Sequence, residues 1–580
     1  MKGRPMPQDA VEAGGHARPT PSQPERYDVV ILGGGAAGLT LALQLKQARP
    51  DISMLVVERQ QHPVPEAAHK VGESTVEIGG RYLRDVLGLT EHLREQQLDK
   101  FGIRMFFSAE GNEDITRRAE VGHAVLPPYD VSSFQLDRGR LENYLASDLV
   151  ERGVRFVYGK VEDVDLRSDQ PHRVTIVGTD GGRQQVETRW ALDATGRYSL
   201  LKRKLGLTRD SEHRAEAVWF RIGHPIDIND WSDDPQWQGR IQSGRRELST
   251  NHLLGRGYWV WLIRLASDSI SIGIVADPDL HPFDTMNRFE RALDWLREHE
   301  PQCARVVEEH KDKLQDFKVL RNYPYSVEQV YSADRWALTG EAGLFLDPFY
   351  SPGFDMISIS NGLITDLVTR DLDGEDITEL AAIHNQMYLT IGEGWFKIYT
   401  HQYPLMGNAR VMQSKVIWDT AVYWAVPALL YFHDKIRRLV DHPQLVWGLA
   451  RFHAAINHVQ RFFREWDAVD RSQLKDSFAS FYHFDFMKRV HIGLVAEMND
   501  EEFEAQFEEN VRLVERISGQ LIKRILDEGD AEEGNEPMRA QVERWRGDDE
   551  LMRFVEVYEK DRAAGILDDD WIPATKTAQN

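Results

Sequence analysis

The chain has 580 residues, 42% of them hydrophobic and 28% charged, which is typical of a globular enzyme with two or three domains. Its formal net charge of −23 argues against a nucleic-acid-binding protein, because such proteins bind phosphates through cationic side chains. The single cysteine, Cys303, excludes an internal disulfide and a cysteine-based metal or iron–sulfur site, and it indicates a reducing compartment.

The sequence shows no sign of export or membrane insertion. Residues 1–25 are rich in Pro, Gly and charge and lack the apolar segment of a signal peptide, so they predict a disordered tail. The longest apolar run, residues 421–432, contains a proline and is too short to span a bilayer. We therefore expect a soluble, cytoplasmic protein without a membrane span.

The first ordered segment predicts the start of a doubly wound α/β sheet. Residues 27–32 form a β-branched run, residues 36–48 have helical apolar spacing, and residues 54–57 form a second strand. The strand, glycine-rich turn, helix and second strand follow each other in the order of a Rossmann-like unit.

The rest of the chain predicts an inserted sheet and then a helical region. Residues 76–98 are predicted to be helical, and short strands with a hairpin turn at residues 180–182 fill residues 154–194. Further alternating strands between about 211 and 320 predict an antiparallel sheet with one face free to form the wall of a pocket. The remaining expectations are a strand at 336–339, a helix at 358–370, and helices beyond 375 with a loop at the acidic stretch 527–536.

This pattern gives a predicted organisation in three parts. Residues 1–25 form the tail, residues 26–370 form a Rossmann-like module that contains the sheet of about 211–320, and residues 371–580 form a mainly helical C-terminal region. The predicted fold class is α/β, with an inserted antiparallel-sheet substrate domain.

A glycine motif predicts where a dinucleotide binds. The pattern G-x-G-x-x-G follows a strand and opens a helix, and Glu58 ends the next strand twenty residues later. The glycines allow a pyrophosphate to approach the free amides at the helix start, and a carboxylate at the position of Glu58 binds ribose hydroxyls. A purely structural tight turn is the alternative, but the combination favours a site made by Gly33, Gly35, Ala36, Ala37, Gly38 and Glu58.

Two later segments identify the dinucleotide. Residues 190–197 (WALDATGR) and 336–342 (WALTGEA) each read as a strand that ends in a small-residue turn with an acid. With the glycine motif, their order and spacing resemble the flavoprotein monooxygenase superfamily. The resemblance implies that FAD is bound with the help of Asp193, Gly196 and Glu341, where Glu341 replaces the usual aspartate. Arg138 resembles a position near the flavin in that superfamily.

Three further segments narrow the resemblance to flavin-dependent halogenases. Residues 259–263 (WVWLI) match W-x-W-x-I, although Arg264 stands where the family has proline, and residues 345–353 (FLDPFYSPG) match F-x-x-P-x-x-S-x-G. The third match is V-G-E-S-T at 71–75 followed by K-F-G-I-R at 100–104. The resemblance places Trp259 and Trp261 beside the flavin, Pro348 and Gly353 in its loop, and a catalytic lysine at Lys100. The alternatives are a pair of core tryptophans and a solvated lysine at a helix end.

The resemblance also implies a reaction. In halogenases, FADH2 and O2 form a flavin hydroperoxide, a halide attacks it to give hypohalous acid, and the acid travels to a separate substrate pocket. There the lysine ammonium holds the oxidant by a hydrogen bond, or the free amine forms a haloamine. Burial would lower the lysine pKa and favour the amine route.

The loop after Phe345 departs from the family in two ways. Halogenases bind halide through the backbone amides of the two residues after the motif serine, here Ser351, but Pro352 has no amide hydrogen and only Gly353 remains. Tryptophan halogenases have a catalytic glutamate where this chain has Tyr350, so the loop resembles phenol- or pyrrole-type halogenases. Tyr350 is expected to contact the substrate or to pack beneath the flavin with Phe349.

Three functions therefore stay open from the sequence. The first is FADH2-dependent halogenation of a phenol- or pyrrole-like ring, supported by Lys100 and the complete F-x-x-P-x-x-S-x-G motif. The second is an FAD-dependent monooxygenase or dehydrogenase without halide chemistry, supported by Pro352, Arg264 and Glu341. The third is a flavin-binding protein without turnover.

The expected partners follow from the halogenase hypothesis. They are halide and O2 as co-substrates, a small aromatic substrate that is free or bound to a carrier protein, and a separate flavin reductase. Basic clusters at 202–204 and 435–438 are candidate docking points for an acidic carrier, with a solvated helix end as the alternative. No metal site is expected, because His453 and His458 do not share a helix face.

Overall fold

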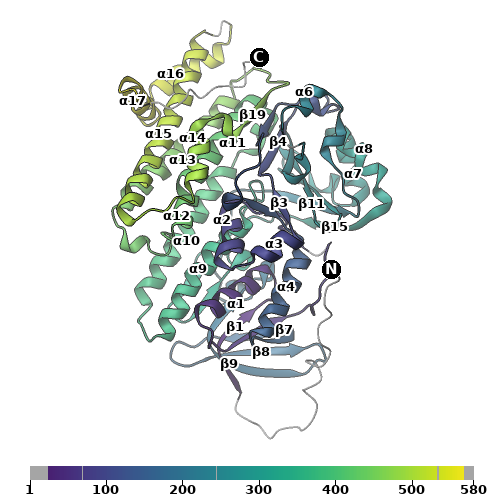
Figure 1. Cartoon of the computed structure of the whole chain (residues 1–580), viewed down its shortest axis with the longest axis vertical. Coiled ribbons are helices and arrows are strands. Elements are labelled where there is room, and N and C mark those ends of the chain that lie inside the picture. The colour runs from purple at the N-terminus through teal and green to yellow at the C-terminus, as the bar shows by residue number, and fades with distance from the viewer. Residues whose placement is uncertain (1–23, 68–69, 243, 532–533, 567–580) are drawn as a thin grey trace.

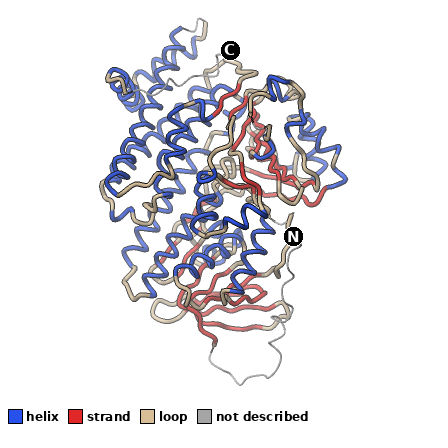
Figure 2. The backbone as a smooth tube through the Cα atoms, viewed as in Figure 1, coloured by secondary structure: helices blue, strands red, loops and turns tan. Residues whose placement is uncertain are grey.

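The chain folds into two sheets flanked by a stack of helices, as the computed structural model shows for residues 24–67, 70–242, 244–531 and 534–566 (Figure 1). The first sheet and its helices lie at the lower end of the view, and the second sheet lies above it with helices on its outer side. Most C-terminal helices run along one flank of both sheets (Figure 2). This agrees with the predicted α/β class with an added sheet and a helical C-terminal region.

The first sheet has the parallel core of a dinucleotide-binding unit. Strands β1, β2, β7, β9 and β18 are parallel, and β8 forms antiparallel pairs with the long strands β7 and β9. Its strands are β1 (Glu25–Leu32), β2 (Met54–Glu58), β7 (Arg155–Asp165), β8 (His172–Gly178), β9 (Arg183–Asp193), β17 (Tyr331–Ser332) and β18 (Trp336–Leu338). Helices α1 (Ala36–Ala48), α4 (Arg138–Glu151) and α9 (Gly353–Leu372) belong to this unit. The hairpin predicted at 180–182 is confirmed.

The second sheet is mostly antiparallel and has eight strands in the order β15-β11-β14-β13-β12-β4-β5-β19. They are β4 (Ile103–Phe107), β5 (Glu120–Gly122), β11 (Glu216–Ile222), β12 (Thr250–Gly255), β13 (Tyr258–Arg264), β14 (Ile270–Ala276), β15 (Leu314–Leu320) and β19 (Phe478–Ser480). Helices α7 (Phe289–His299) and α8 (Pro301–Glu309) pack on its outer face in a separate apolar core. The inner face is left to line cavities.

Two small strand pairs and short helices connect the sheets. The pairs are β3 (Leu98–Lys100) with β6 (Ser133–Gln135), and β10 (Thr208–Asp210) with β16 (Tyr325–Val327). The short helices are α2 (Glu77–Arg81), α3 (Thr90–Gln96), α5 (Leu200–Lys204) and α6 (Pro235–Gln238). The helical prediction for 76–98 holds for Glu77–Val86, where a π-helical turn continues α2, and for α3, with a break at residues 87–89.

The C-terminal region is helical but also completes the second sheet. Its helices are α10 (Thr378–Tyr399), α11 (Ala409–Tyr423), α12 (Leu429–Phe432), α13 (Leu445–Asp467), α14 (Asp485–Gly493), α15 (Asp500–Ala531), α16 (Glu536–Arg546) and α17 (Asp549–Ala563). Strand β19 pairs with β5 at the edge of the second sheet, which hydropathy alone did not indicate. No helix in the described part of the chain is long and apolar enough to cross a membrane.

The loop predicted at 527–536 is wrong over its first half, because α15 continues to Ala531. Ion pairs from Lys523 to Asp527 and from Arg524 to Glu528 have the i,i+4 spacing that stabilises a helix. Gly529 is buried against α16, where a side chain would meet Val542. Charge therefore lies on the exposed faces of the helix, and packing extends it.

Helix α9 begins at Gly353, five residues before the predicted start at Ser358. Pro352 precedes it with φ −76°, a value that suits the beginning of a helix. This correction matters for function, because the F-x-x-P-x-x-S-x-G motif leads directly into a helix N-terminus. The predicted tail lies outside the described residues up to residue 23, and β1 begins at Glu25.

Candidate functional site

The glycine motif lies between β1 and α1, and its glycines have different reasons to be glycine. Gly33 has φ +108°, and a Cβ there would lie 2.4 Å from Ala194 O, whereas a Cβ on Gly38 would lie 2.1 Å from Gly33 O. Packing therefore requires glycine at both positions. A Cβ on Gly35 would meet only Lys70 Nζ, at 3.1 Å, so the fold itself does not demand glycine there.

The surroundings of Gly35 fit a pyrophosphate. Gly35 caps α1 without a side-chain hydrogen bond, and the first-turn amides of Ala36 and Ala37 have no partner inside the helix. Lys70 Nζ lies over this helix end and is 3.3 Å from Glu142. Glu58 ends β2, and its carboxylate accepts a hydrogen bond of 2.7 Å from the Gly34 amide.

The ends of β9 and β18 bring the next two predicted segments together beside the glycine motif. A Cβ on Gly196 would lie 3.9 Å from Glu341 Oε2, so the two turns face each other. The Asp193 carboxylate is fully buried and accepts hydrogen bonds from Thr195 and from the Leu201 amide. Asp193 therefore holds the turn in shape, whereas the Glu341 carboxylate reaches the cavity described next.

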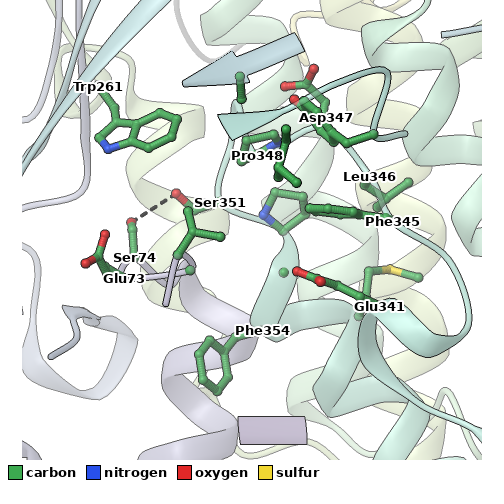
Figure 3. A pocket seen from close by; sticks show the side chains of 18 of the residues that line it. Glu73, Ser74, Trp261, Glu341, Phe345, Leu346, Asp347, Pro348, Ser351 and Phe354 are labelled. Atoms are coloured by element: carbon green, nitrogen blue, oxygen red, sulfur yellow. Dashed lines mark hydrogen bonds between the residues drawn. The ribbon is translucent and has the colours of Figure 1, made fainter. Parts of the chain in front are cut away.

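A cavity of about 1080 Å³ opens between the first sheet, the second sheet and the start of α9 (Figure 3). Its mainly apolar lining suits a large flat ring system. Figure 3 shows Trp261 on one side, Glu341 on the opposite side, and Ser351 and Pro348 between them. The predicted site residues that line it are Arg138, Trp259, Trp261, Glu341, Pro348, Ser351 and Gly353.

The two tryptophans of β13 point into this cavity, as their alternation predicts, whereas Tyr258 packs on the opposite face of the sheet. Their ring centroids are 5.7 Å apart. Trp261 fits because Gly273 lies opposite it on β14, where a Cβ would be 2.2 Å from the indole. Trp259 Nε1 donates to the Tyr403 hydroxyl at 3.0 Å.

Tyr403 joins the two family motifs. Its hydroxyl donates to Asp347 Oδ2 at 2.6 Å, and the same oxygen lies 2.7 Å from His213 Nε2. Asp347 belongs to the F-L-D-P-F-Y-S-P-G segment, and Tyr403 lies in the C-terminal region. The hydrogen bonds therefore fix the tryptophan strand relative to the loop before α9.

Lys100 lies at the end of β3 and is buried, with 1% of its surface exposed. Its amine donates to Ser74 Oγ at 2.9 Å and to Thr75 O at 2.7 Å. Burial lowers the pKa of Lys100 to about 7, although the nearby carboxylates of Glu77 and Asp355 oppose this shift. The alternative of a solvated lysine is thus wrong, and its amine is partly uncharged at neutral pH.

Ser74 connects Lys100 with the first cavity. Its hydroxyl accepts from Lys100 and from Ser351 Oγ at 2.9 Å, and it lies 2.8 Å from Thr250 Oγ1 (Figure 3). Ser351 itself has φ +60°, an uncommon conformation for a residue with a side chain that costs roughly 1–3 kcal/mol. The loop holds Ser351 where it contacts Ser74.

A second cavity of about 520 Å³ lies on the other side of this connection. Its lining combines aromatic rings with a few polar groups and includes Val76, Glu77, His123, Tyr350, Trp395, Asp419, Tyr423, Trp424 and Phe481. The Tyr350 hydroxyl donates to Asp419 Oδ2 at 2.8 Å. Of the two expectations for Tyr350, the structure places it in this second cavity and not in the lining of the first.

The lysine lies between the two cavities. Ser74 lines the first, Val76 and Glu77 line the second, and the Lys100 amine bonds to Ser74 and to the intervening Thr75.

Comparisons with known proteins agree with this arrangement. A family model described as an FAD binding domain matches residues 26–252. A flavin-dependent halogenase of Dictyostelium discoideum is 23% identical over 69% of this chain and 70% of its own length. A 1H-pyrrole-2-carbonyl-[peptidyl-carrier protein] brominase of Pseudoalteromonas luteoviolacea is 26% identical over 61% of this chain and 80% of its own length. The crystal structure of halogenase PltM with phloroglucinol and FAD shares the fold, with a TM-score of 0.62 and 16% identity over 83% of this chain and 96% of that one.

The matched domain is an FAD binding domain, and the relatives that these comparisons find are named halogenases, a brominase and a chlorinase. The chain is an FAD-dependent oxidoreductase, and the site fits its cofactor. The glycine cradle accepts a pyrophosphate, and the first cavity accepts an isoalloxazine ring. Arg138 Nε is buried in that cavity without a partner among the described residues, which leaves a donor for a bound group.

Sequence reasoning missed several residues of this site. Lys70 lies over the start of α1, and Arg221 ties the V-G-E-S-T loop to the second sheet through bonds to Glu73, Asp316 and the Lys70 carbonyl. A lone lysine two residues before the V-G-E-S-T glycine was the available signal for Lys70. Arg221 carried no signal, because its partners lie about 90 to 150 residues away in the chain.

The members of the predicted basic clusters differ in exposure, because Arg203 and Lys204 are exposed whereas Lys202 and Lys435 are buried. Lys435 is buried and paired with Asp500, and Arg437 and Arg438 pair with acidic neighbours. Lys202 is buried, and its amine donates to Gly343 O at 2.9 Å. Within the described residues, no group of three or more His, Cys, Asp or Glu is placed to hold a metal ion.

Proposed function

We propose that the chain catalyses FADH2-dependent halogenation of a small, electron-rich aromatic ring of the phenol or pyrrole type. When bound, reduced FAD supplies with O2 the oxidising power that converts halide into hypohalous acid. The observation that carries the proposal is the position of Lys100, buried between a flavin-sized cavity and a smaller aromatic-lined cavity.

Each group of residues at the site would have its own role in this reaction. Gly35, Lys70 and Glu58 hold the dinucleotide, and Trp259 and Trp261 fill the space through which an organic substrate would otherwise reach the flavin. The Lys100 amine binds the hypohalous acid or takes its halogen as a haloamine, and delivers the halogen to a ring in the second cavity. A pKa of about 7 favours the amine route at and above neutral pH.

The names of the relatives support two forms of substrate. One relative acts on a pyrrole-2-carbonyl group bound to a peptidyl-carrier protein, and the PltM crystals contain phloroglucinol. We propose a free phenolic substrate, the form that the PltM crystals contain. We further propose that a separate flavin reductase supplies FADH2.

Halide binding is expected to be weak, because Pro352 removes one of two backbone donors. Gly353 opens α9, so its amide is one of the first-turn donors that have no partner inside the helix. The loss of one hydrogen-bond donor to an anion costs roughly 1.5–3 kcal/mol of binding free energy. This lowers the halide affinity about 10- to 100-fold.

Replacing Pro352 with Thr or Ala should therefore tighten halide binding about 10- to 100-fold. Both residues restore the amide hydrogen, and only Thr adds a hydroxyl, so equal gains would identify the amide as the donor. The measurement is bromide titrated against product yield, with FAD, a reductase, NADH, O2 and a phenol present. Turnover that is indifferent to bromide in all three proteins would favour the monooxygenase or dehydrogenase alternative.

A further inference from the structure

The polar groups of the second cavity suggest what kind of ring it accepts. A hydroxyl-bearing ring needs an acceptor for its O–H hydrogen, and the cavity contains two carboxylates, Glu77 and Asp419. They differ in how much of their hydrogen-bonding capacity the protein already uses.

Asp419 is saturated by the protein. Its Oδ1 accepts from Gln460 at 2.6 Å, and its Oδ2 accepts from Tyr350 at 2.8 Å and from Lys415 at 2.7 Å. The Tyr350 hydroxyl therefore has no further hydrogen to donate to a ligand. The Thr420 hydroxyl in the same wall donates to the Val416 carbonyl at 2.7 Å. Both Asp419 oxygens are thus already engaged by donors of the protein, and these groups shape the wall of the cavity.

Tyr423 is also engaged on both sides of its hydroxyl. It donates to Asp355 Oδ2 at 2.8 Å and accepts from the Ile78 amide at 3.1 Å. Asp355 accepts in addition from the Gly79 amide, and burial raises the pKa of Asp355 to about 8. This carboxyl is therefore largely protonated at neutral pH and is a poor proton acceptor.

Glu77 differs from these groups. It begins α2 and lines the cavity, and its Oε1 lies 3.2 Å from His491 Nε2 on α14. The Tyr482 hydroxyl lies 2.7 Å from the other ring nitrogen of His491, and His491 stacks on Trp424 with ring centroids 3.9 Å apart. Within the described residues His491 Nε2 has no hydrogen-bond partner, so its contact with Glu77 is one of proximity and leaves the carboxylate able to accept from a ligand.

The charge state of Glu77 suits an acceptor. Burial raises its pKa, but the contact with His491 and the nearby charge of Lys100 outweigh burial, so the pKa lies below the ordinary value. His123, the other ring nitrogen acceptor in the wall, has a pKa well below its usual range because of burial and the neighbouring His491 and Arg104. Glu77 is therefore an ionised carboxylate that faces the cavity and can accept a hydrogen bond.

We infer that Glu77 is a catalytic residue that binds the hydroxyl of a phenolic substrate in the second cavity and takes its proton during halogen transfer. This inference rests on the proposed halogenation and names the substrate class as a hydroxyl-bearing arene. The residue lies two positions after Thr75, whose carbonyl binds Lys100. A phenol bonded to Glu77 is thus held in the cavity whose wall adjoins the halogen-delivering amine.

The step balances with hypohalous acid as the oxidant. The ring carbon ortho or para to the hydroxyl attacks the halogen, so a carbon–halogen bond forms and the halogen–oxygen bond breaks. The phenol O–H proton passes to Glu77, and the released hydroxide takes that proton to become water. The halodienone then loses its ring proton and its oxygen regains one. One phenol and one hypohalous acid give one halophenol and one water.

The test compares phloroglucinol with 1,3,5-trimethoxybenzene, a ring of similar electron richness that cannot donate a hydrogen bond. In the FAD-loaded wild-type enzyme, kcat/KM for bromination should be about 10- to 100-fold higher for phloroglucinol, as expected for a hydrogen bond to a charged group. Glu77→Gln should reduce bromination of phloroglucinol by a similar factor and leave the ether unchanged. Glu216→Gln, at a buried glutamate on β11 that lines neither cavity, should change neither.

Two further measurements separate the outcomes. Oxidised bromine, trapped by an added thiol, should form equally in wild type and Glu77→Gln, and phloroglucinol should bind Glu77→Gln more weakly in equilibrium dialysis. Unchanged selectivity and binding in Glu77→Gln, or an equal loss for both rings, would overturn the inference and leave the halogenase proposal intact. Absence of oxidised bromine in the wild type would instead contradict the halogenase proposal, and the dialysis would still decide whether Glu77 binds the hydroxyl.

Discussion

Lys100→Met should reduce product formation by about two to four orders of magnitude while FAD binding and flavin oxidation continue, the scale expected when a positioned catalytic group is lost. Met fills the volume of a buried lysine stem but cannot bind hypohalous acid. The oxidant would then form in the first cavity and escape. The measurement is brominated product per flavin oxidised, with escaped oxidant trapped by an added thiol.

A matched control is available at Lys202, which is also buried and also has a lowered pKa, of about 8, because of its burial. Its amine bonds to Gly343 O and lies over the Tyr325 ring, whereas the Lys100 amine bonds to Ser74 and Thr75 between the two cavities. Lys202→Met should cost stability like Lys100→Met but leave product per flavin unchanged. Full product yield from Lys100→Met would place the halogen-transferring group elsewhere.

The pH dependence of the same step follows from the lysine pKa. Burial favours the uncharged form, so the fraction of free amine rises as the pH increases through about 7. If the halogen is carried as a haloamine, the amount of brominated product per hypohalous acid formed should rise with pH through this range. The same ratio in Lys100→Met serves as the baseline. A fall through the same range would indicate that the ammonium holds the oxidant by a hydrogen bond.

Gly35→Val should abolish FAD binding in a protein that still folds. The first atoms of the new side chain meet only the flexible end of Lys70, but they enter the space in front of the α1 amides. A pyrophosphate that cannot reach these amides loses several charge-assisted hydrogen bonds, each worth about 1.5–3 kcal/mol, so affinity should fall more than 100-fold. FAD stoichiometry after gel filtration and the Tm together measure the effect.

Two comparisons show whether the loss is specific. Gly362→Ala, inside α9 where a Cβ would meet no atom within 4 Å, should keep both FAD and stability. Gly33→Ala should unfold or strongly destabilise the protein, because its φ of +108° and the Ala194 carbonyl exclude a side chain. Wild-type FAD affinity in Gly35→Val would contradict the assignment of the dinucleotide site.

The parts of the site that follow local patterns could be predicted from the sequence. The strand, glycine turn, helix and acid at Glu58 are neighbours in the chain, and the two tryptophans share a face because strands alternate. The start of α9 was predicted too late, because helical spacing alone does not show that Pro352 serves as the residue before the first turn.

The parts that depend on distant segments could not be predicted. Lys100 is buried by its contacts with Ser74 and Thr75, and nothing in its own segment distinguishes a buried lysine from a solvated one. Tyr350 was assigned two possible roles because its partner, Asp419, comes from a helix 69 residues later. The second cavity exists only where the C-terminal helices meet both sheets, so its lining had no signal in the sequence.

The most direct test of the central claim is the mass of the product formed from phloroglucinol by the wild-type enzyme with FAD, a reductase, NADH, O2 and bromide. The account predicts a product in which bromine replaces hydrogen, with the two-isotope pattern of bromine, and a yield that rises with bromide and vanishes without the reductase. A hydroxylated or desaturated product whose yield is the same with and without bromide would contradict it.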